Sequence, residues 1–187
     1  MKFQDLIFTL GIAIIWVLLY YGNHTLFRFT EVTSITNLIF IPSGYKIIVA
    51  TVFRWRGWVG LFIGSLMTGY LFLDTFSSID IVVFSFLSAT LPLLALKLTE
   101  YCIPLKHDLS NLDIKHILLL GFSYGTMNGL FHISYRYHVL FLRDAYKIHE
   151  IFSMMVGDVL GILITMLIIA RLTKLDMVQN FLKNRGG

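Results

Sequence analysis

Residues 10–19 read LGIAIIWVLL, a run with no charged side chain and no alternation of polar and apolar residues. A strand of a membrane β-barrel requires that alternation, whereas a helix that crosses a bilayer requires only about 20 mostly apolar residues. The run therefore predicts a membrane helix, and five more apolar stretches follow it. We expect an all-α integral membrane protein of about six helices in a single domain, residues 1–187, with spans at 6–21, 36–53, 58–73, 80–97, 116–135 and 151–170 and a short cytoplasmic tail at 171–187.

The composition indicates the same class of protein. Of the 187 residues, 57% are hydrophobic and 14% are charged, and the mean hydropathy is +0.77. Soluble domains carry about 25% charged residues. The near-continuous apolar runs exclude a large soluble catalytic domain, and they exclude a nucleic-acid-binding chain in spite of the net charge of +4.

The sequence contains no motif for catalysis or metal binding. It has neither HExxH nor GxSxG nor a glycine-rich phosphate loop, and the single cysteine, Cys102, permits no internal disulfide and no spaced Cys/His zinc site. His116 and His132 would lie about 24 Å apart on one helix, too far apart to bind one haem iron. We expect a protein that is not an enzyme and has no metal site, and the sequence identifies no cofactor.

Lysine and arginine are distributed unevenly over the two sides of the predicted bundle. With Lys46 set aside because it falls within a span, ten of these residues lie on the side of the termini and four on the other side. Cytoplasmic loops carry the excess of basic residues. We therefore expect a multi-pass protein of the bacterial inner membrane, surrounded by membrane lipids, with both termini in the cytoplasm.

Small residues recur every four positions on three of the predicted helices. Four residues turn a helix by roughly 400°, so these residues share one face and let a neighbouring backbone approach closely. The spacing predicts tight helix packing at Gly60, Gly64, Gly121, Gly125, Gly129, Gly157 and Gly161.

Three polar side chains fall inside predicted spans, where a charge costs at least roughly 2.5–3.5 kcal/mol. Counting inward from the outer ends at about 1.5 Å per residue places Lys46, Asp158 and Asn128 roughly 15, 12 and 11 Å deep, each on the small-residue face of its helix. We expect an intramembrane polar cluster with two interpretations: a buried ion pair that orders the helices, or a polar pocket open to the outside. Pro42 and Gly44 would loosen the second helix near Lys46.

Several short motifs follow one another between Ile41 and Arg171. They are Pro42-Ser43-Gly44, the basic turn Arg54-Trp55-Arg56-Gly57, the small-residue helix Gly60 to Gly69, the Leu109-Ser110 stretch that leads into Gly121 to Gly129, and Gly157-Asp158-Val159-Leu160-Gly161. In this order of features the chain resembles the membrane-associated sensor domain family (MASE-type), found at the N-terminus of many bacterial histidine kinases and diguanylate cyclases. That family usually has about eight spans and a cytoplasmic output domain, whereas six spans and no output domain are expected here. Its aromatic residues before the Gly-Asp are replaced by Ser153-Met154-Met155-Val156.

The resemblance implies a sensory or accessory subunit that acts through a partner protein in the membrane. Substrate-binding subunits of vitamin transporters are also six-span proteins of this size, but they carry small residues on the first helix, where residues 10–16 offer no four-spaced small pair. A structural subunit of a larger respiratory or photosynthetic complex is the third interpretation, because aromatic-rich flanks and missing catalytic motifs suit it. We expect other membrane protein subunits as partners and no nucleic acid.

Overall fold

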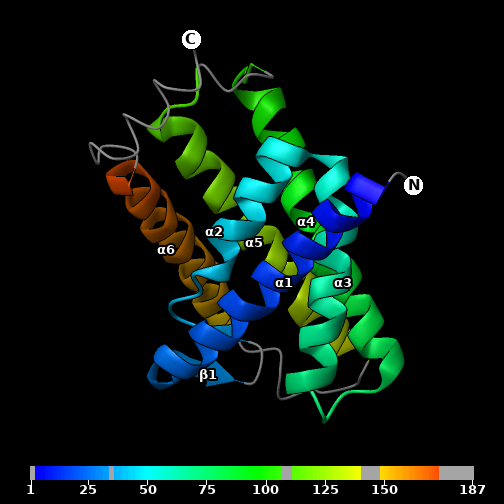
Figure 1. Ribbon diagram of the computed structural model, residues 1–187. Helices are drawn as coiled ribbons and strands as arrows, with labels where there is room; N and C mark the ends of the chain where they lie inside the picture. Colours follow the sequence, from blue (N-terminus) through cyan, green and yellow to red (C-terminus); the bar gives the residue numbers. More distant parts are fainter. Residues whose placement is uncertain (1–2, 34–35, 107–110, 140–147, 173–187) are drawn as a thin grey trace.

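Figure 1 shows the computed structural model, which describes residues 3–33, 36–106, 111–139 and 148–172. These residues are mostly helical, so the predicted all-α class is confirmed. The helices are α1 (Phe3–Leu26), α2 (Pro42–Ile48), α3 (Trp55–Phe72), α4 (Ser78–Cys102), α5 (Ile114–His138) and α6 (Ile148–Leu172). Most of the expected tail, residues 173–187, lies outside the described residues.

Three helical stretches are long and apolar enough to cross a membrane, namely Gln4–Leu26, Ser78–Cys102 and His149–Ile169. They support the expected membrane protein. The other three helices of the described ranges do not meet this criterion of length and hydropathy. Helix α2 has only seven residues, α3 has an arginine in its first turn, and α5 carries several polar side chains. Length and hydropathy of the described helices therefore identify three candidate spans, whereas the sequence pattern predicts six.

Helix α4 is the central helix of the bundle. It packs against α3 and α5 and also contacts α2, while α1 packs on α3, α6 packs on α5, and α2 contacts both α1 and α6. In the most apolar window of each helix, 61% of α4 is buried, against 22% of α1 and 28% of α6. The first residues of α1 and the last residues of α6 lie toward the same end of the bundle (Figure 1). The exposed apolar faces of α1 and α6 suit contact with lipid chains.

The second expected span is only partly helical. The sequence predicts a helix over 36–53, but β1 (Glu31–Thr33) pairs antiparallel with β2 (Thr36–Asn37), and residues 38–41 follow β2 with a bend at Leu38 and a turn at Ile41. The helix begins at Pro42, because proline has no N–H to lose in a first turn. It runs through α2 into a π-helical turn, η2 (Val49–Phe53), and ends at Arg54 with φ 51° and ψ −133°. A π-helical turn followed by a positive φ at a residue other than glycine makes a strained corner before α3.

Glycines of α3 bring that helix close to α1. A Cβ at Gly60 would lie 2.7 Å from the side chain of Ile12, and a Cβ at Gly64 would lie 2.7 Å from the side chain of Trp16. Both distances are shorter than real Cβ contacts, so a side chain at either position would push the two helices apart.

Glycines of α5 bring that helix close to α6. A Cβ at Gly125 would lie 2.9 Å from the carbonyl oxygen of Met155, and a Cβ at Gly129 would lie 3.0 Å from that of Ile151. At Gly121 the nearest atom, on Ile162, would be 3.5 Å away, an ordinary contact. The closest approach of α5 to α6 is therefore on the side of Gly125 and Gly129.

On α6 the neighbouring backbone is the non-helical segment 37–41 and not the helix that the sequence predicts. A Cβ at Gly157 would collide with the carbonyl oxygen of Asn37, and a Cβ at Gly161 would collide with that of Phe40. The backbone N–H of Phe40 donates to the carbonyl oxygen of Gly157 over 3.1 Å. The two glycines thus form a shallow seat on α6 for residues 37–41.

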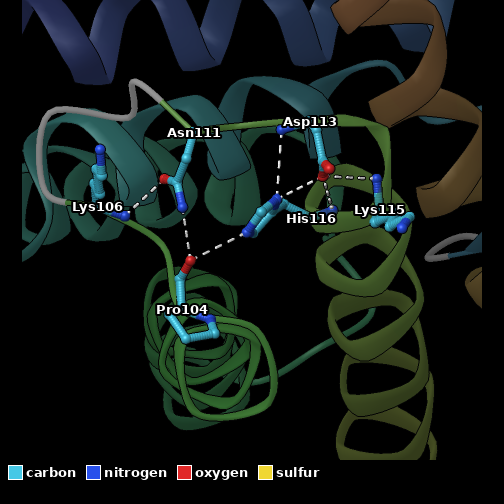
Figure 2. A network of polar contacts seen from close by, with 6 residues as sticks. All are labelled: Pro104, Lys106, Asn111, Asp113, Lys115 and His116. Carbon is cyan, nitrogen blue, oxygen red and sulfur yellow. Dashed lines mark hydrogen bonds and ion pairs between the residues drawn. The ribbon is translucent and has the colours of Figure 1, made fainter.

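A network of polar contacts holds the connection between α4 and α5 (Figure 2). Asn111 donates to the carbonyl oxygen of Pro104 over 2.8 Å, and Asp113 accepts from the backbone N–H groups of Lys115 and His116 at 3.0 and 3.1 Å. The backbone N–H and the imidazole of His116 hold the pKa of Asp113 below its ordinary value. Asp113 therefore acts as the charged N-cap of α5.

Substitution of Gly161 tests the seat on α6. Gly161→Ala should lower the free energy of unfolding by roughly 1–3 kcal/mol, because the new Cβ meets the backbone of Phe40 and the non-helical segment must shift. Gly11→Ala is a matched control, since nothing lies within 4 Å of a Cβ there, and it should leave stability unchanged or slightly raised. Thermal unfolding of both purified variants in one detergent gives the comparison. Equal melting temperatures would mean that the segment does not lie this close to α6.

Candidate functional site

A cavity of about 90 Å³ lies inside the bundle, between side chains from all six helices. We call it the central cavity. Its walls belong to the second halves of α1, α3 and α5 and to the first halves of α4 and α6, so it lies nearer the β1–β2 hairpin than the α4–α5 connection. A cavity of this size has room for about six to nine water-sized groups. The lining residues are Trp16, Tyr20, Asn37, Phe40, Lys46, Ser65, Thr68, Gly69, Leu73, Ile81, Phe84, Ser85, Ser88, Asn128, His132, Met154 and Asp158.

The ammonium group of Lys46 lies among aromatic side chains. Its Nζ donates a hydrogen bond of 3.0 Å to the Tyr124 hydroxyl and lies 4.7 Å from the centre of the Trp16 ring and 5.8 Å from that of Phe40. Ring faces attract a cation, more strongly where water is excluded, and Lys46 is only 4% exposed. An ammonium group has three N–H donors. Among the described residues, only Tyr124 accepts one of them, which leaves two for another acceptor.

Hydrogen bonds from α3 fix the aromatic wall beside Lys46. The indole N–H of Trp16 donates to the Thr68 hydroxyl over 3.1 Å, which holds the ring in place. The Ser65 hydroxyl donates to the Ser88 hydroxyl of α4 over 3.0 Å, so α3 and α4 are joined at the same level. The cavity therefore has one wall of rings and one of hydroxyl groups.

Asp158 and Asn128 form a second polar group on the cavity wall. The amide Nδ2 of Asn128 donates to Oδ2 of Asp158 over 2.8 Å, and the two residues are 3% and 1% exposed. The Asn128 Oδ1 atom is buried and has no hydrogen-bond partner. A buried acceptor without a donor costs free energy, which a bound donor would recover.

The structure brings the three predicted polar residues to one cavity but does not join the two charges directly. Lys46, Asn128 and Asp158 all line the central cavity. Among the ion pairs of the described residues, none joins Lys46 to Asp158. The ammonium is held by the Tyr124 hydroxyl and the rings, while the carboxylate is held by the Asn128 amide. The cavity thus separates a cation from an anion.

Sequence reasoning did not single out Tyr124, and it considered His132 as a haem ligand, which the distance to His116 excluded. Tyr124, Asn128 and His132 follow one another at four-residue intervals on α5, and this spacing of polar groups inside a span is the signal that could have identified them. The His132 ring lines the cavity and stacks on Phe84, with ring centres 5.3 Å apart and planes inclined by 16°. Among the described residues nothing hydrogen-bonds to the imidazole of His132, so it adds a free polar edge to the cavity.

Comparisons of the chain with protein-family models, with curated proteins and with solved structures find no match. Over the described ranges, no three His, Cys, Asp or Glu side chains gather where they could hold a metal ion. The arrangement offers charge, hydrogen-bond donors, hydrogen-bond acceptors and ring faces around one small volume. Its chemistry is that of a site for a small molecule with both polar and apolar parts.

The balance of charge across the cavity can be tested with a double-mutant cycle. Lys46→Met and Asp158→Asn should each lower the free energy of unfolding by a few kcal/mol, because each leaves one buried charge without its opposite. The double substitution should recover part of the combined loss. Unfolding of the four proteins in one detergent, followed by tryptophan fluorescence, gives the coupling free energy.

Two surface substitutions control for the loss of charge alone. Lys97→Met removes an ammonium whose side chain is 63% exposed, and Asp74→Asn removes an exposed carboxylate from the α3–α4 connection. Both should change stability little, since exposed charges contribute about 0–1 kcal/mol. Strictly additive losses of unfolding free energy in the double variant would show that Lys46 and Asp158 do not interact across the cavity.

Proposed function

We propose that this chain is a non-catalytic membrane receptor for a small molecule, acting as a sensory or accessory subunit through a partner protein in the membrane. The central cavity is the observation that carries this proposal. It lies inside the bundle, it is walled by all six helices, and it holds a lysine, an aspartate and an asparagine at depth. Polar groups inside a membrane domain are costly, and their usual reason is binding or transport.

The pattern of satisfied and unsatisfied groups supports a ligand site over a purely structural cluster. A structural ion pair gains its free energy from direct contact, and Lys46 makes its contacts with Tyr124 and Trp16 instead. Asn128 keeps an unpartnered oxygen. A structural subunit of a respiratory or photosynthetic complex would not need a cavity of about 90 Å³ with free polar groups on its wall.

The short second helix supports a sensory role. Lys46 lies on α2, and Arg54, eight residues further on, forms an ion pair of 2.7 Å with Glu100 of α4. The strained backbone of Arg54 and the π-helical turn before it link the cavity wall to this ion pair. A ligand that changes the contacts of Lys46 would shift this short helix, and the Arg54–Glu100 pair would carry the shift to α4.

The same cavity suits a second candidate, the substrate-binding subunit of a vitamin-type transporter. Such a subunit also needs a small-molecule site inside its bundle. The nature of the partner distinguishes the two proposals: a signalling protein supports the receptor, and an energy-coupling transport subunit supports the transporter.

The receptor crosses the bacterial inner membrane six times, with both termini in the cytoplasm. Helices α3 and α5, with 18 and 25 residues, are about 27 and 38 Å long, near the roughly 30 Å of a bilayer core. The remaining crossing combines the non-helical residues 37–41 with the seven residues of α2 and five of η2, which together are about 18 Å long. Irregular backbone is tolerated at membrane depth where protein buries it, and α6 covers this stretch.

The single cysteine tests this orientation in the native chain. Cys102 is exposed at the end of α4, on the side where the basic residues are concentrated. A membrane-impermeant maleimide should label it in inside-out vesicles and leave it unlabelled in intact spheroplasts. Asp74→Cys in a Cys102→Ser background should show the opposite pattern, because the α3–α4 connection lies at the other end of α4. Labelling of both positions from one side would contradict the proposed crossings.

Ligand retention tests the receptor itself. The protein is purified in lipid nanodiscs and denatured, and the released small molecules are identified by mass spectrometry. The wild type and the surface control Lys97→Met should release the same compound in near-stoichiometric amount, and Lys46→Met should release at least tenfold less. A folded wild type that releases no compound would favour the structural-subunit interpretation.

A further inference from the structure

We propose that the central cavity binds a small zwitterion, a molecule of amino-acid type whose carboxylate lies at Lys46 and whose ammonium lies at Asp158 and Asn128. This inference rests on the receptor function proposed above and adds the chemical class of the ligand. It is carried by three observations: the separation of the two buried charges, the groups that lack hydrogen-bond partners, and the aromatic wall.

The charges of the cavity select a ligand of zero net charge. Lys46 and Asp158 are 4% and 1% exposed and carry opposite charges, and none of the ion pairs of the described residues joins them. A ligand with a net charge would leave one uncompensated charge inside the bundle, at a cost of several kcal/mol. A zwitterion places one charge of each sign beside its opposite and leaves the total unchanged.

The unpartnered groups give the ligand its orientation. At Lys46, two N–H donors have no acceptor among the described residues, so this end requires an acceptor such as a carboxylate. A carboxylate only accepts hydrogen bonds, so the side-chain NH₂ group of Asn128 faces Asp158. The Asn128 Oδ1 atom then has no hydrogen-bond donor. The second end therefore offers only oxygens and requires a donor such as an ammonium.

The remaining walls limit the size and shape of the ligand. The cavity holds about 90 Å³, room for about six to nine water-sized groups, which limits the ligand to fewer than about ten non-hydrogen atoms. Trp16, Phe40 and Phe84 contribute aromatic rings to the wall, which favour an apolar body between the two charged ends. An amino acid with a compact apolar side chain has this combination of charges and body.

Two sets of analogues on constant skeletons test the class of ligand with the wild-type chain. The first set is L-leucine, 4-methylpentanoate and 3-methylbutylamine; the second is L-valine, 3-methylbutanoate and 2-methylpropylamine. Within each set the compounds carry both charges, the carboxylate alone and the ammonium alone. All compounds are added at one concentration, about a hundredfold above the Kd of the zwitterion. At least one of the two zwitterions should then raise the melting temperature of the detergent-solubilised protein by roughly 5–10 °C. The singly charged analogues should raise it at least fivefold less.

Matched variants locate the effect in the cavity. Lys46→Met and Asp158→Asn should each abolish the shift, while Lys97→Met and Asp74→Asn should retain it. Because the analogue series needs only the wild type, the test does not depend on whether the cavity variants fold. The proposal of a zwitterionic ligand would be contradicted if only the carboxylate compounds or only the ammonium compounds stabilised the protein, or if none of the six did. If none of the six binds but the wild type still releases a compound that Lys46→Met lacks, the receptor stands and only the ligand class fails.

Discussion

The close seat of the non-helical segment 37–41 on α6 is the constraint on which the rest of the structure depends. Inside a membrane domain every backbone polar group needs a partner, and a segment outside the helices lacks the hydrogen bonds that a helix makes within itself. Here α6 and its neighbours supply the partners: Gly157 accepts from the backbone of Phe40, and Thr165 donates to Ile41. Only glycine at positions 157 and 161 leaves room for this contact.

This seat determines where the cavity and its charges lie. Because the chain forms a bend and a turn before Pro42 and no helix, the second helix begins deep in the bundle and Lys46 lies within its second turn. The Ser43 hydroxyl donates to the carbonyl oxygen of Asp158, so the start of α2 is tied to the turn of α6 that carries the carboxylate. A full-length helix in this place would fill the bundle with side chains. The short helix leaves the space that becomes the central cavity.

The sequence predicts the helices with continuous apolar runs, and it selects three of the polar residues that line the cavity, because both depend on hydropathy and helical spacing alone. It does not predict the non-helical stretch, since residues 38–41 are all apolar, as in a membrane helix, and the stretch packs on glycines more than a hundred residues away. It also does not predict that Lys46 contacts rings in place of a carboxylate. That choice depends on how Trp16 of α1 and Tyr124 of α5 are oriented, and only the packed bundle defines their orientation.

The free energies involved suggest why the cavity keeps its charges. A cluster that served only to pack helices could be replaced by apolar residues of similar volume, often with a gain in stability. Here the lysine and the aspartate are each given a separate set of partners, and each set is incomplete. Partners that hold a charge in place without satisfying it lower the cost of rearrangement when a ligand arrives. On the proposed receptor function, the free-energy cost of the unpartnered groups in the empty cavity is recovered on binding, so the protein would be most stable with the cavity filled.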